Sequence, residues 1–407
     1  MRVFFHVRQK MNSPKPISIL VATFTFPPNK DGVAEASSSM VQVFLNKGWH
    51  VDVATGPTSL PRNSLNFLGS KIYEFAITGT PYFKDPFRGE IIKYRNFLLQ
   101  GDWDLIVFQS YWWPLYLALP ILNQMRSKKI LVSHGHSGIN VSLTPVFPFG
   151  ILFYLFTIYQ SIMMLGWLKK FERVVFLSRR CDFNNFFDHY LAKLCKHPHI
   201  KVIPNGVNSS QAFLPSGLSF RHKHNIPASC IFFLCVANYE TRKDQGFAVK
   251  AFRKAAIPNS VLVFIGSKFN QFSCSLQRDD APFAFHNSVG SIIWLENVPR
   301  DETLSAFSEC DCFVLSSKRE AQPIALLEAM NFSRPWVARD SGCISEMPGG
   351  IVVQNISTMA VAMSRIANDS EQRCRLGRIG FSATQDIFDI KKTSSAWIKL
   401  AEGLSSN

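Results

Sequence analysis

The chain carries short apolar segments that are separated by stretches with helical spacing. The segments are apolar throughout, without alternation, which is typical of strands buried on both faces of a parallel α/β sheet. We predict strands in a first half at residues 17–22, 51–54, 104–108, 130–133, 174–177 and 201–203. In a second half we predict strands at residues 231–237, 261–265, 292–295, 312–315, 336–338 and 350–353.

The first predicted helix illustrates the pattern between the strands. Its apolar positions recur about every 3.6 residues, and Gly48 stands where a C-terminal cap belongs. The apolar positions are Val33, Ala36, Met40, Val41 and Phe44. This spacing predicts an amphipathic helix that packs on the sheet.

The length of the chain indicates two domains, because 407 residues exceed what one ordinary core serves. The predicted fold class is α/β, with two Rossmann-like parallel-sheet domains facing each other across a deep cleft. We place the domains at residues 1–210 and 211–389, joined near 209–228. A C-terminal helix at about 390–407 is expected to pack back on the first domain.

Residues 143–168 depart from this pattern. From Ile151 to Leu168 there are eighteen residues without a charge, at the threshold of a membrane span. Thr157, Gln160 and Ser161 weaken that interpretation, and a span here would separate two strands of one sheet. The alternative is a buried helix, or one resting on a membrane surface with Lys169, Lys170 and Arg173 at the headgroups.

Composition and charge narrow the function classes. A hydrophobic content of 47% with 18% charged residues is typical of a folded protein. The nine cysteines are scattered without CxxC spacing, which favours reduced thiols in a cytoplasmic protein, and the N-terminus lacks the apolar core of a signal peptide. The net charge of +15 contains no long basic run, so we expect no nucleic acid partner; it suits anionic lipid or a phosphorylated ligand.

Two candidate sites follow strands of the first half, where ligands bind in open α/β sheets. Gly32 and Val33 end the loop 27–33 before the first helix, whose N-terminus would attract phosphate. Neither GxGxxG nor GxxxxGK[ST] occurs in the chain, so an ordinary turn remains the alternative. His134 follows the fourth strand and could bond a sugar hydroxyl or transfer a proton; His136 permits a metal pair, and a purely structural histidine stays open.

Two further candidate sites follow strands of the second half. Lys243 would neutralise a departing diphosphate, the alternative being a solvated lysine. Glu320 lies in a loop, Pro323 suits the first turn of the next helix, and Glu328 falls inside that almost wholly apolar helix. A carboxylate there needs partners, which a ribose diol or an internal arginine could supply.

Taken together and in this order, these sites resemble the retaining family-4 glycosyltransferases of the GT-B fold. The resemblance covers nearly the whole chain from about Ile17. Its most specific part is the E-x7-E motif, Glu320 and Glu328. The supporting residues are Gly32 and Val33, His134, Lys243, and the segments 204–207, 335–337 and 341–346.

The resemblance implies a role for each matching residue. Glu320 would contact hydroxyls of the donor sugar, Glu328 the ribose, and His134 the reaction centre. The diphosphate would be held by Lys243, by the backbone after Glu320, and from the other domain by Gly32. The implied donor-binding positions are Gly32, Val33, Asn238, Arg242, Lys243, Val298, Gln322, Pro323, Ile324 and Glu328, with the nucleotide base near 292–298.

The implied reaction is transfer of a hexose from a UDP- or GDP-hexose to a saccharide or lipid-linked saccharide, with retention of anomeric configuration and no metal. The first domain would bind the acceptor and the second the donor. The implied setting is bacterial surface-polysaccharide assembly in the cytoplasm, peripheral on the inner face of an anionic plasma membrane.

Two residues depart from the family pattern. Asn238 stands where the family usually has an arginine, and Pro323 where it usually has a glycine, which removes one backbone donor. Arg242 is a candidate replacement for the missing arginine. These departures favour one alternative, a non-catalytic GT-B scaffold subunit, which would not turn over a donor. A second alternative, independent of them, is a GT-B sugar-nucleotide epimerase, which would need no acceptor.

Overall fold

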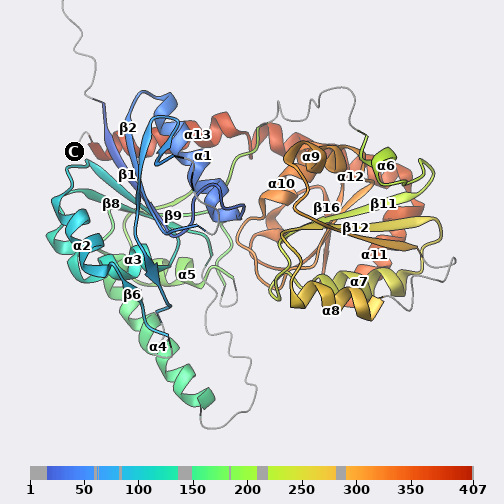
Figure 1. Ribbon diagram of the computed structural model, residues 1–407, viewed down its shortest axis with the longest axis horizontal. Helices are drawn as coiled ribbons and strands as arrows, with labels where there is room; N and C mark the ends of the chain where they lie inside the picture. Colours follow the sequence, from blue (N-terminus) through green and yellow to red (C-terminus); the bar gives the residue numbers. More distant parts are fainter. Residues whose placement is uncertain are drawn as a thin grey trace, which may run out of the picture.

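Two parallel sheets form the frame of the molecule, one in each half of the chain (Figure 1). The computed structural model describes residues 16–58, 62, 64–81, 85–135, 149–182, 185–208, 219–280 and 290–405. The first sheet has eight strands in the order β10-β9-β8-β7-β1-β2-β4-β3, parallel except for β3 against β4. The second has six parallel strands in the order β13-β12-β11-β14-β15-β16.

The first sheet and a small antiparallel pair, β5 with β6, belong to the first half of the chain. Their strands are β1 (Ser18–Thr23), β2 (His50–Thr55), β3 (Asn66–Phe67), β4 (Ser70–Glu74), β5 (Ile77–Thr78), β6 (Arg88–Gly89), β7 (Leu105–Gln109), β8 (Lys128–Ser133), β9 (Arg173–Phe176) and β10 (Ile200–Val202). The helices of this half are α1 (Gly32–Asn46), α2 (Ile91–Gln100), α3 (Trp113–Ala118), the 3-10 helix η1 (Leu119–Gln124), α4 (Phe149–Leu168) and α5 (Phe187–Leu194).

The second half is built in the same way. Its strands are β11 (Ile231–Val236), β12 (Ser260–Gly266), β13 (Ser291–Glu296), β14 (Cys312–Leu315), β15 (Trp336–Arg339) and β16 (Gly350–Val353). Its helices are α6 (Phe220–Lys223), α7 (Gln245–Ala255), α8 (Gln271–Asp280), α9 (Arg300–Glu309), α10 (Ile324–Asn331), the 3-10 helix η4 (Ile344–Glu346), α11 (Ile356–Asn368), α12 (Ser370–Asp386) and α13 (Ile390–Ser405).

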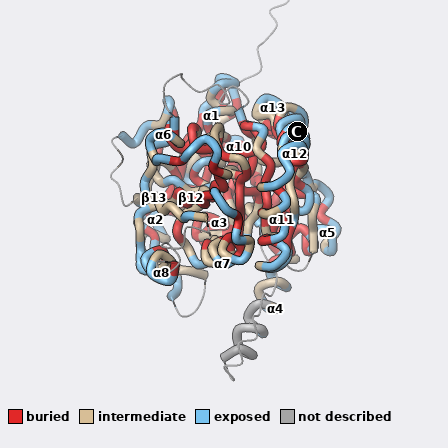
Figure 2. The backbone as a smooth tube through the Cα atoms, turned by 90° about the vertical axis from the view of Figure 1, so that its right-hand side faces the viewer, coloured by how far each residue is buried: buried red, intermediate tan, exposed pale blue. Residues whose placement is uncertain are grey.

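Each sheet is buried on both faces, as wholly apolar strands require. In β1, Leu20 and Ala22 face one core of the first half, whereas Ile19 and Val21 face the other. The second sheet also separates two cores. Figure 2 shows these buried interiors enclosed by exposed helix surfaces.

The predicted α/β fold is confirmed, and every predicted strand is present within two residues of its predicted position. The predicted first helix corresponds to α1, and Gly48 follows its C-cap with φ of +82°. The sequence reading missed β3 to β6. In β4 the cause is visible, because this edge region of the sheet carries polar residues and only part of the strand is buried.

The C-terminal helix α13 returns to the first half of the chain. Trp397, Ala401 and Leu404 are buried in the core beneath α1, and Lys47 pairs with Glu402 at 3.2 Å. Gly206 lies so close to α13 that a Cβ atom would stand 2.4 Å from Thr393 Oγ1. Both chain crossings between the halves therefore run side by side.

The apolar segment at 143–168 is helical from Phe149 onward, and residues 143–148 lie outside the described residues. Helix α4 projects from the first half, away from both sheets (Figure 1). In the described parts of the chain, no helix combines the length and the hydrophobicity that crossing a membrane requires.

Candidate active site

The loop after β1 is held by the N-cap of α1. Asp31 Oδ1 accepts hydrogen bonds from the backbone N–H groups of Val33 (3.0 Å) and Ala34 (3.1 Å), and Thr25 Oγ1 donates to Asp31 Oδ2 at 2.6 Å. The exposed Gly32 has no atom within 4 Å of where its Cβ would lie. The backbone at Gly32 is thus open to the surroundings, whereas the N–H groups of Val33 and Ala34 are already bonded to Asp31.

His134 stands at the carboxyl end of β8, near this loop. Its Nε2 lies 2.7 Å from Gln109 Oε1, while Gln109 Nε2 points at Met40 Sδ, 3.0 Å away. This amide orientation assigns Nε2–H of His134 as the donor, which leaves Nδ1 as an acceptor. Burial lowers the pKa of His134 to about 4, against the opposing influence of the nearby Asp31 carboxylate. His134 is therefore neutral at neutral pH.

A buried carboxylate supports the loop that carries His134. Asp188 is fully buried on α5 and accepts a hydrogen bond from Ser133 Oγ, which itself accepts one from the N–H of Gly135 at 3.1 Å. Gly135 adopts a φ of +83°, a conformation that favours glycine. These contacts fix the turn in which His134 leaves the sheet.

Lys243 and Glu320 meet across the ends of β11 and β14. Lys243 Nζ lies 2.6 Å from Glu320 Oε1, and both side chains are largely buried. Ser316 Oγ donates to the carbonyl of Lys243 (2.9 Å), and the N–H of Lys318 donates to the carbonyl of Arg242 (2.9 Å). The two loops therefore form one unit that offers a cation and a carboxylate side by side.

Glu328 lies buried on α10 and pairs with the half-exposed Arg300 at the start of α9. Burial raises the pKa of Glu328, the Arg300 guanidinium opposes that rise, and Glu35 of α1 adds to it. The structure thus pairs Glu328 with an internal arginine, one of the two kinds of partner that the sequence predicts. Because Arg300 is half exposed, it can leave Glu328 free to accept bonds from a ligand.

A cavity of about 220 Å³ joins the two halves at this point. Glu35, Gln109 and His134 line it from the first half, and Ile324 and Glu328 from the second. The structure thus brings His134 and Glu328 to one cavity although 194 positions separate them in the sequence.

The Glu320 loop also touches the His134 loop directly. A Cβ atom on Gly135 would lie 3.3 Å from Cβ of Ala321, the residue after Glu320. Gly342 packs on the other side of the Glu320 loop with φ of +55°, and a Cβ there would stand 2.2 Å from the Glu320 carbonyl oxygen. The Lys243–Glu320 pair and the His134 turn therefore belong to one site.

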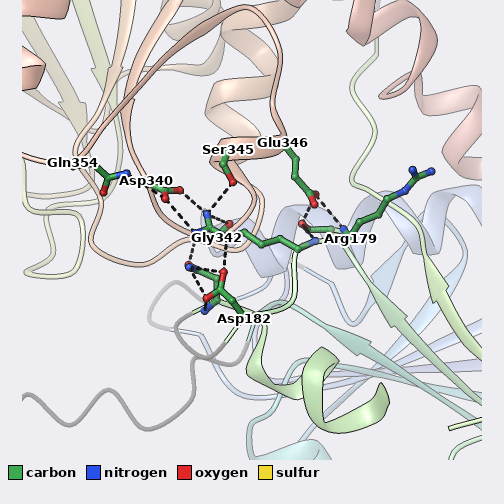
Figure 3. Close-up of polar contacts among 10 residues, drawn as sticks. Arg179, Asp182, Asp340, Gly342, Ser345, Glu346 and Gln354 are labelled. Atoms are coloured by element: carbon green, nitrogen blue, oxygen red, sulfur yellow. Dashed lines mark hydrogen bonds and ion pairs between the residues drawn. The ribbon is translucent and has the colours of Figure 1, made fainter. Parts of the chain in front are cut away.

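Polar contacts between the halves lie beside this site, around Asp340 and Glu346 (Figure 3). Arg180, after β9, pairs with Asp340 at 2.5 Å and donates to the carbonyl of Gly342 at 3.0 Å. Ser178 Oγ donates to Glu346 Oε2 at 2.5 Å. These bonds connect the first half to the loop that packs on Glu320.

The remaining predicted residues surround the site at different depths. Gln322 is buried, and its Oε1 accepts from the N–H of Asn205 at 2.5 Å. Pro323 is the N-cap of α10, one residue before the helix and not inside its first turn, and Ile324 begins the helix. Arg242 pairs with Glu240 at 2.5 Å on the surface.

Asn238 and Val298 lie beyond the carboxyl ends of β11 and β13. Asn238 follows β11 with its carbonyl bonded to Gln245 Nε2 at 2.9 Å. Val298 follows β13 and packs, partly buried, against the core.

Within the described residues, no group of three or more His, Cys, Asp or Glu side chains is placed to hold a metal ion, and His136 lies outside them.

Sequence reasoning missed several residues of the site. Asp31 carried a readable signal, because an aspartate directly before an apolar helical pattern is a typical N-cap. Arg300, Gln109 and Arg180 carried none, since their partners are 28, 25 and 160 positions away. Such contacts depend on the tertiary fold.

Comparison with known proteins shows a similarity to one family over the second half of the chain. Residues 218–380 match the model of the family described as glycosyl transferases group 1. No curated protein sequence matches the chain.

Several solved structures share the fold. Sucrose-phosphate synthase from Thermosynechococcus elongatus matches with a TM-score of 0.74 at 18% identity, over 96% of this chain and 99% of that chain. HepE from Anabaena, solved with UDP and glucose, matches with a TM-score of 0.71 at 15% identity, over 96% and 100%. A UDP-forming trehalose-phosphate synthase from Burkholderia xenovorans matches with 0.66 at 11%, over 96% and 99%. Residues 218–380 therefore resemble the glycosyl transferases group 1 family, and the chain as a whole shares the two-domain GT-B fold of these structures.

Proposed function

We propose that the protein transfers a hexose from a nucleotide-diphosphate sugar to a saccharide or lipid-linked saccharide, with retention of anomeric configuration and without a metal. The observation that carries the proposal is the meeting of Lys243, Glu320 and the His134 turn where the two halves touch. A UDP donor is favoured by the UDP and UDP-glucose in the HepE structures.

Each group has a role in this proposal. When the donor binds, Glu328 releases Arg300 and accepts hydrogen bonds from the ribose diol. Glu320 gives up part of its contact with Lys243 and accepts hydrogen bonds from hydroxyls of the donor sugar. Lys243 and the N-terminus of α1 then hold the diphosphate from opposite sides, where their positive charge stabilises the leaving group. The neutral His134 accepts a hydrogen bond from the donor sugar through Nδ1.

In the transfer step, the acceptor oxygen bonds to C1 of the hexose on the face from which the diphosphate departs. The C1–O bond to the diphosphate breaks, and the hydroxyl proton passes to the departing phosphate oxygen. Fixed donors aimed at developing charge contribute about 3–4 kcal/mol each to such a step. Arg242 pairs with Glu240 and does not face this centre. Lys243 is therefore the main cation of the second half in the proposed stabilisation of the departing diphosphate.

The acceptor part of the proposal rests on charge and on α4. The net charge of +15 and the projecting apolar helix favour an acceptor presented at an anionic membrane, on its cytoplasmic face, as in bacterial surface-polysaccharide assembly.

The test is alanine substitution at Glu320 and at Lys243, with Lys318→Ala as the matched control. Lys318 belongs to the same pair of loops but is half exposed and contacts Asp244. Transfer would be measured with a panel of UDP- and GDP-hexoses, together with donor hydrolysis and binding of UDP and GDP. We expect the turnover number to fall by about 10²–10³ in the first two variants, and to stay near that of the wild type in Lys318→Ala.

Two outcomes would contradict the proposal. Wild-type rates in both Glu320→Ala and Lys243→Ala would remove the assigned roles. Nucleotide binding without turnover of any donor would favour the scaffold alternative, and conversion of the donor sugar without an acceptor would favour the epimerase.

A further inference from the structure

Helix α4 exposes a continuous apolar face. Leu155, Tyr159, Ile162 and Met163 are between 49% and 60% exposed. Their spacing of four, three and one residues places them on one side of an α-helix. Single exposed apolar residues are ordinary, but four on one projecting helix form an interaction surface.

The same helix is firmly rooted in the first half. Met164, Trp167 and Leu168 at its C-terminal end are buried in the core, where the Trp167 ring lies 5.9 Å from Tyr111 and 6.1 Å from Phe171. The exposed apolar face therefore belongs to a helix whose C-terminal end is packed in the core of the first half. The buried end fixes the position of the exposed face relative to the domain, as a lasting interaction surface requires.

Helix α5 extends the surface. It packs against α4 and exposes Tyr190 (47%) and Leu194 (58%). Lys193 of α5 and Lys196, two residues after the helix, are exposed beside these apolar side chains. The α4–α5 surface thus combines large apolar side chains with lysines.

Basic residues outnumber acidic residues in this region of the chain. Residues 149–202 contain eight Lys and Arg against three Asp and Glu. The three acids are already engaged: Glu172 with Lys129, Asp182 with Arg180, and the buried Asp188 with Ser133. Lys169 and Lys170, directly after α4, are exposed. The uncompensated surface charge is therefore positive.

We propose that the α4–α5 surface docks on an anionic lipid bilayer, with α4 entering the outer part of one leaflet and the lysines at the headgroups. Apolar residues that enter the acyl boundary beside a lysine belt are typical of interfacial helices.

This inference deepens the proposed function, because α4 follows β8 and so joins the membrane to the domain that carries His134. It rests on that function for the lipid-linked acceptor. The docking itself needs no turnover, so the two can fail separately.

The experiment measures flotation of the full chain with vesicles of phosphatidylcholine alone or with 30% phosphatidylglycerol, at low and high salt. Two variants remove the lysine belt (Lys169→Glu with Lys170→Glu) or the apolar face (Tyr159→Ser, Ile162→Gln and Met163→Gln). The matched controls are Lys250→Glu with Lys254→Glu on α7, and Ile92→Gln with Val361→Gln, which are exposed elsewhere.

We expect the wild type and both controls to float with anionic vesicles. Binding should weaken by about tenfold or more in the lysine variant, at roughly 1 kcal/mol for each basic residue, and the apolar variant should lose the binding that survives high salt. Transfer to a soluble acceptor should remain unchanged in all of them.

Three results would overturn the docking. In the first, the α4 variants float as well as their controls. In the second, the wild type ignores anionic vesicles at low salt. In the third, the wild type is a dimer in light scattering and the apolar variant is a monomer, which would assign this surface to a second copy of the chain. Absence of transfer in the wild type, with vesicle binding intact, would instead refute the proposed function.

Discussion

His134 shows at the scale of one residue how the fold sets a protonation state. Its ring is partly buried and bonded to Gln109, and burial lowers its pKa to about 4. A neutral imidazole with one free acceptor can bond a sugar hydroxyl without adding charge next to a departing diphosphate. Asp31 opposes the lowering, so the same loop that caps α1 also tunes His134.

This lowered pKa predicts a stability loss in acid that belongs to His134. The unfolded chain takes up the proton near pH 6.5, whereas the folded chain resists until about pH 4. Folding stability should therefore fall as the pH drops through this window, by on the order of 2–3 kcal/mol for this one group. Thermal melts of the wild type and of His134→Gln between pH 8 and pH 4.5 measure it.

The melting temperature of His134→Gln should fall less steeply in acid than that of the wild type. Their difference at pH 8 provides the control, because both side chains are neutral there. Parallel curves over the whole range would show that His134 is not held neutral by the fold.

At the scale of single residues, the sequence predicts which side chains belong to the candidate site, but not which partners they contact. The spacing of Glu320 and Glu328 identified both carboxylates, and the buried position of Glu328 followed from its apolar helix. The partners Lys243 and Arg300 could not be assigned from sequence, because an ion pair depends on the placement of two separate loops. Arg242, the candidate replacement for the missing arginine, pairs with Glu240 in the structure.

Helix α1 shows how one element serves both the fold and the site. Asp31 caps it, Thr25 fixes the cap, and Glu35 one turn further influences Glu328 across the domain boundary. The first turn thus leaves the space around Gly32 open on one side and carries the Glu35 carboxylate on the other. The geometry of the cap should therefore matter for the donor as well as for stability.

We predict that Asp31→Ala lowers the free energy of unfolding by about 1 kcal/mol and also weakens binding of the donor. Asp369→Ala is the matched control, since Asp369 caps α12 through Gln372. It should cost a similar amount of stability and leave the dissociation constant for UDP or GDP unchanged. Denaturant unfolding and calorimetric titration separate the two effects. Equal donor affinity in both variants would contradict a role of the α1 terminus at the diphosphate.

Other elements show where sequence prediction reached its limit. Strands buried on both faces were found, since nothing but an apolar run is needed to recognise them. Strand β4, next to the edge strand β3, escapes this pattern because Ser70, Lys71 and Glu74 share it with only two apolar residues. For helix α4 the sequence predicts several alternatives, because hydropathy alone does not distinguish an anchored, projecting helix from a buried one.

At the scale of the whole molecule, the contacts between the halves lead directly to the site. Arg180 of the first half bonds Asp340 and Gly342 of the second, and Gly342 packs against the Glu320 carbonyl. The relative position of the domains is thereby coupled to the loop that is proposed to bind the donor sugar. Two such domains are expected to move against each other unless their contacts hold them.

Arg180→Ala is therefore predicted to loosen the domains and to weaken donor binding by about fivefold, as for a coupling on the order of 1 kcal/mol. The matched control is Arg221→Ala, which removes an equally buried arginine paired with Asp311 inside the second domain. Small-angle scattering should show a larger radius of gyration for Arg180→Ala alone, whereas both variants should lower the melting temperature. If both variants scattered like the wild type and bound nucleotide equally well, the Arg180 contacts would be cohesive only. The contacts that connect Arg180 through Gly342 to Glu320 would then have no effect on the affinity for the donor.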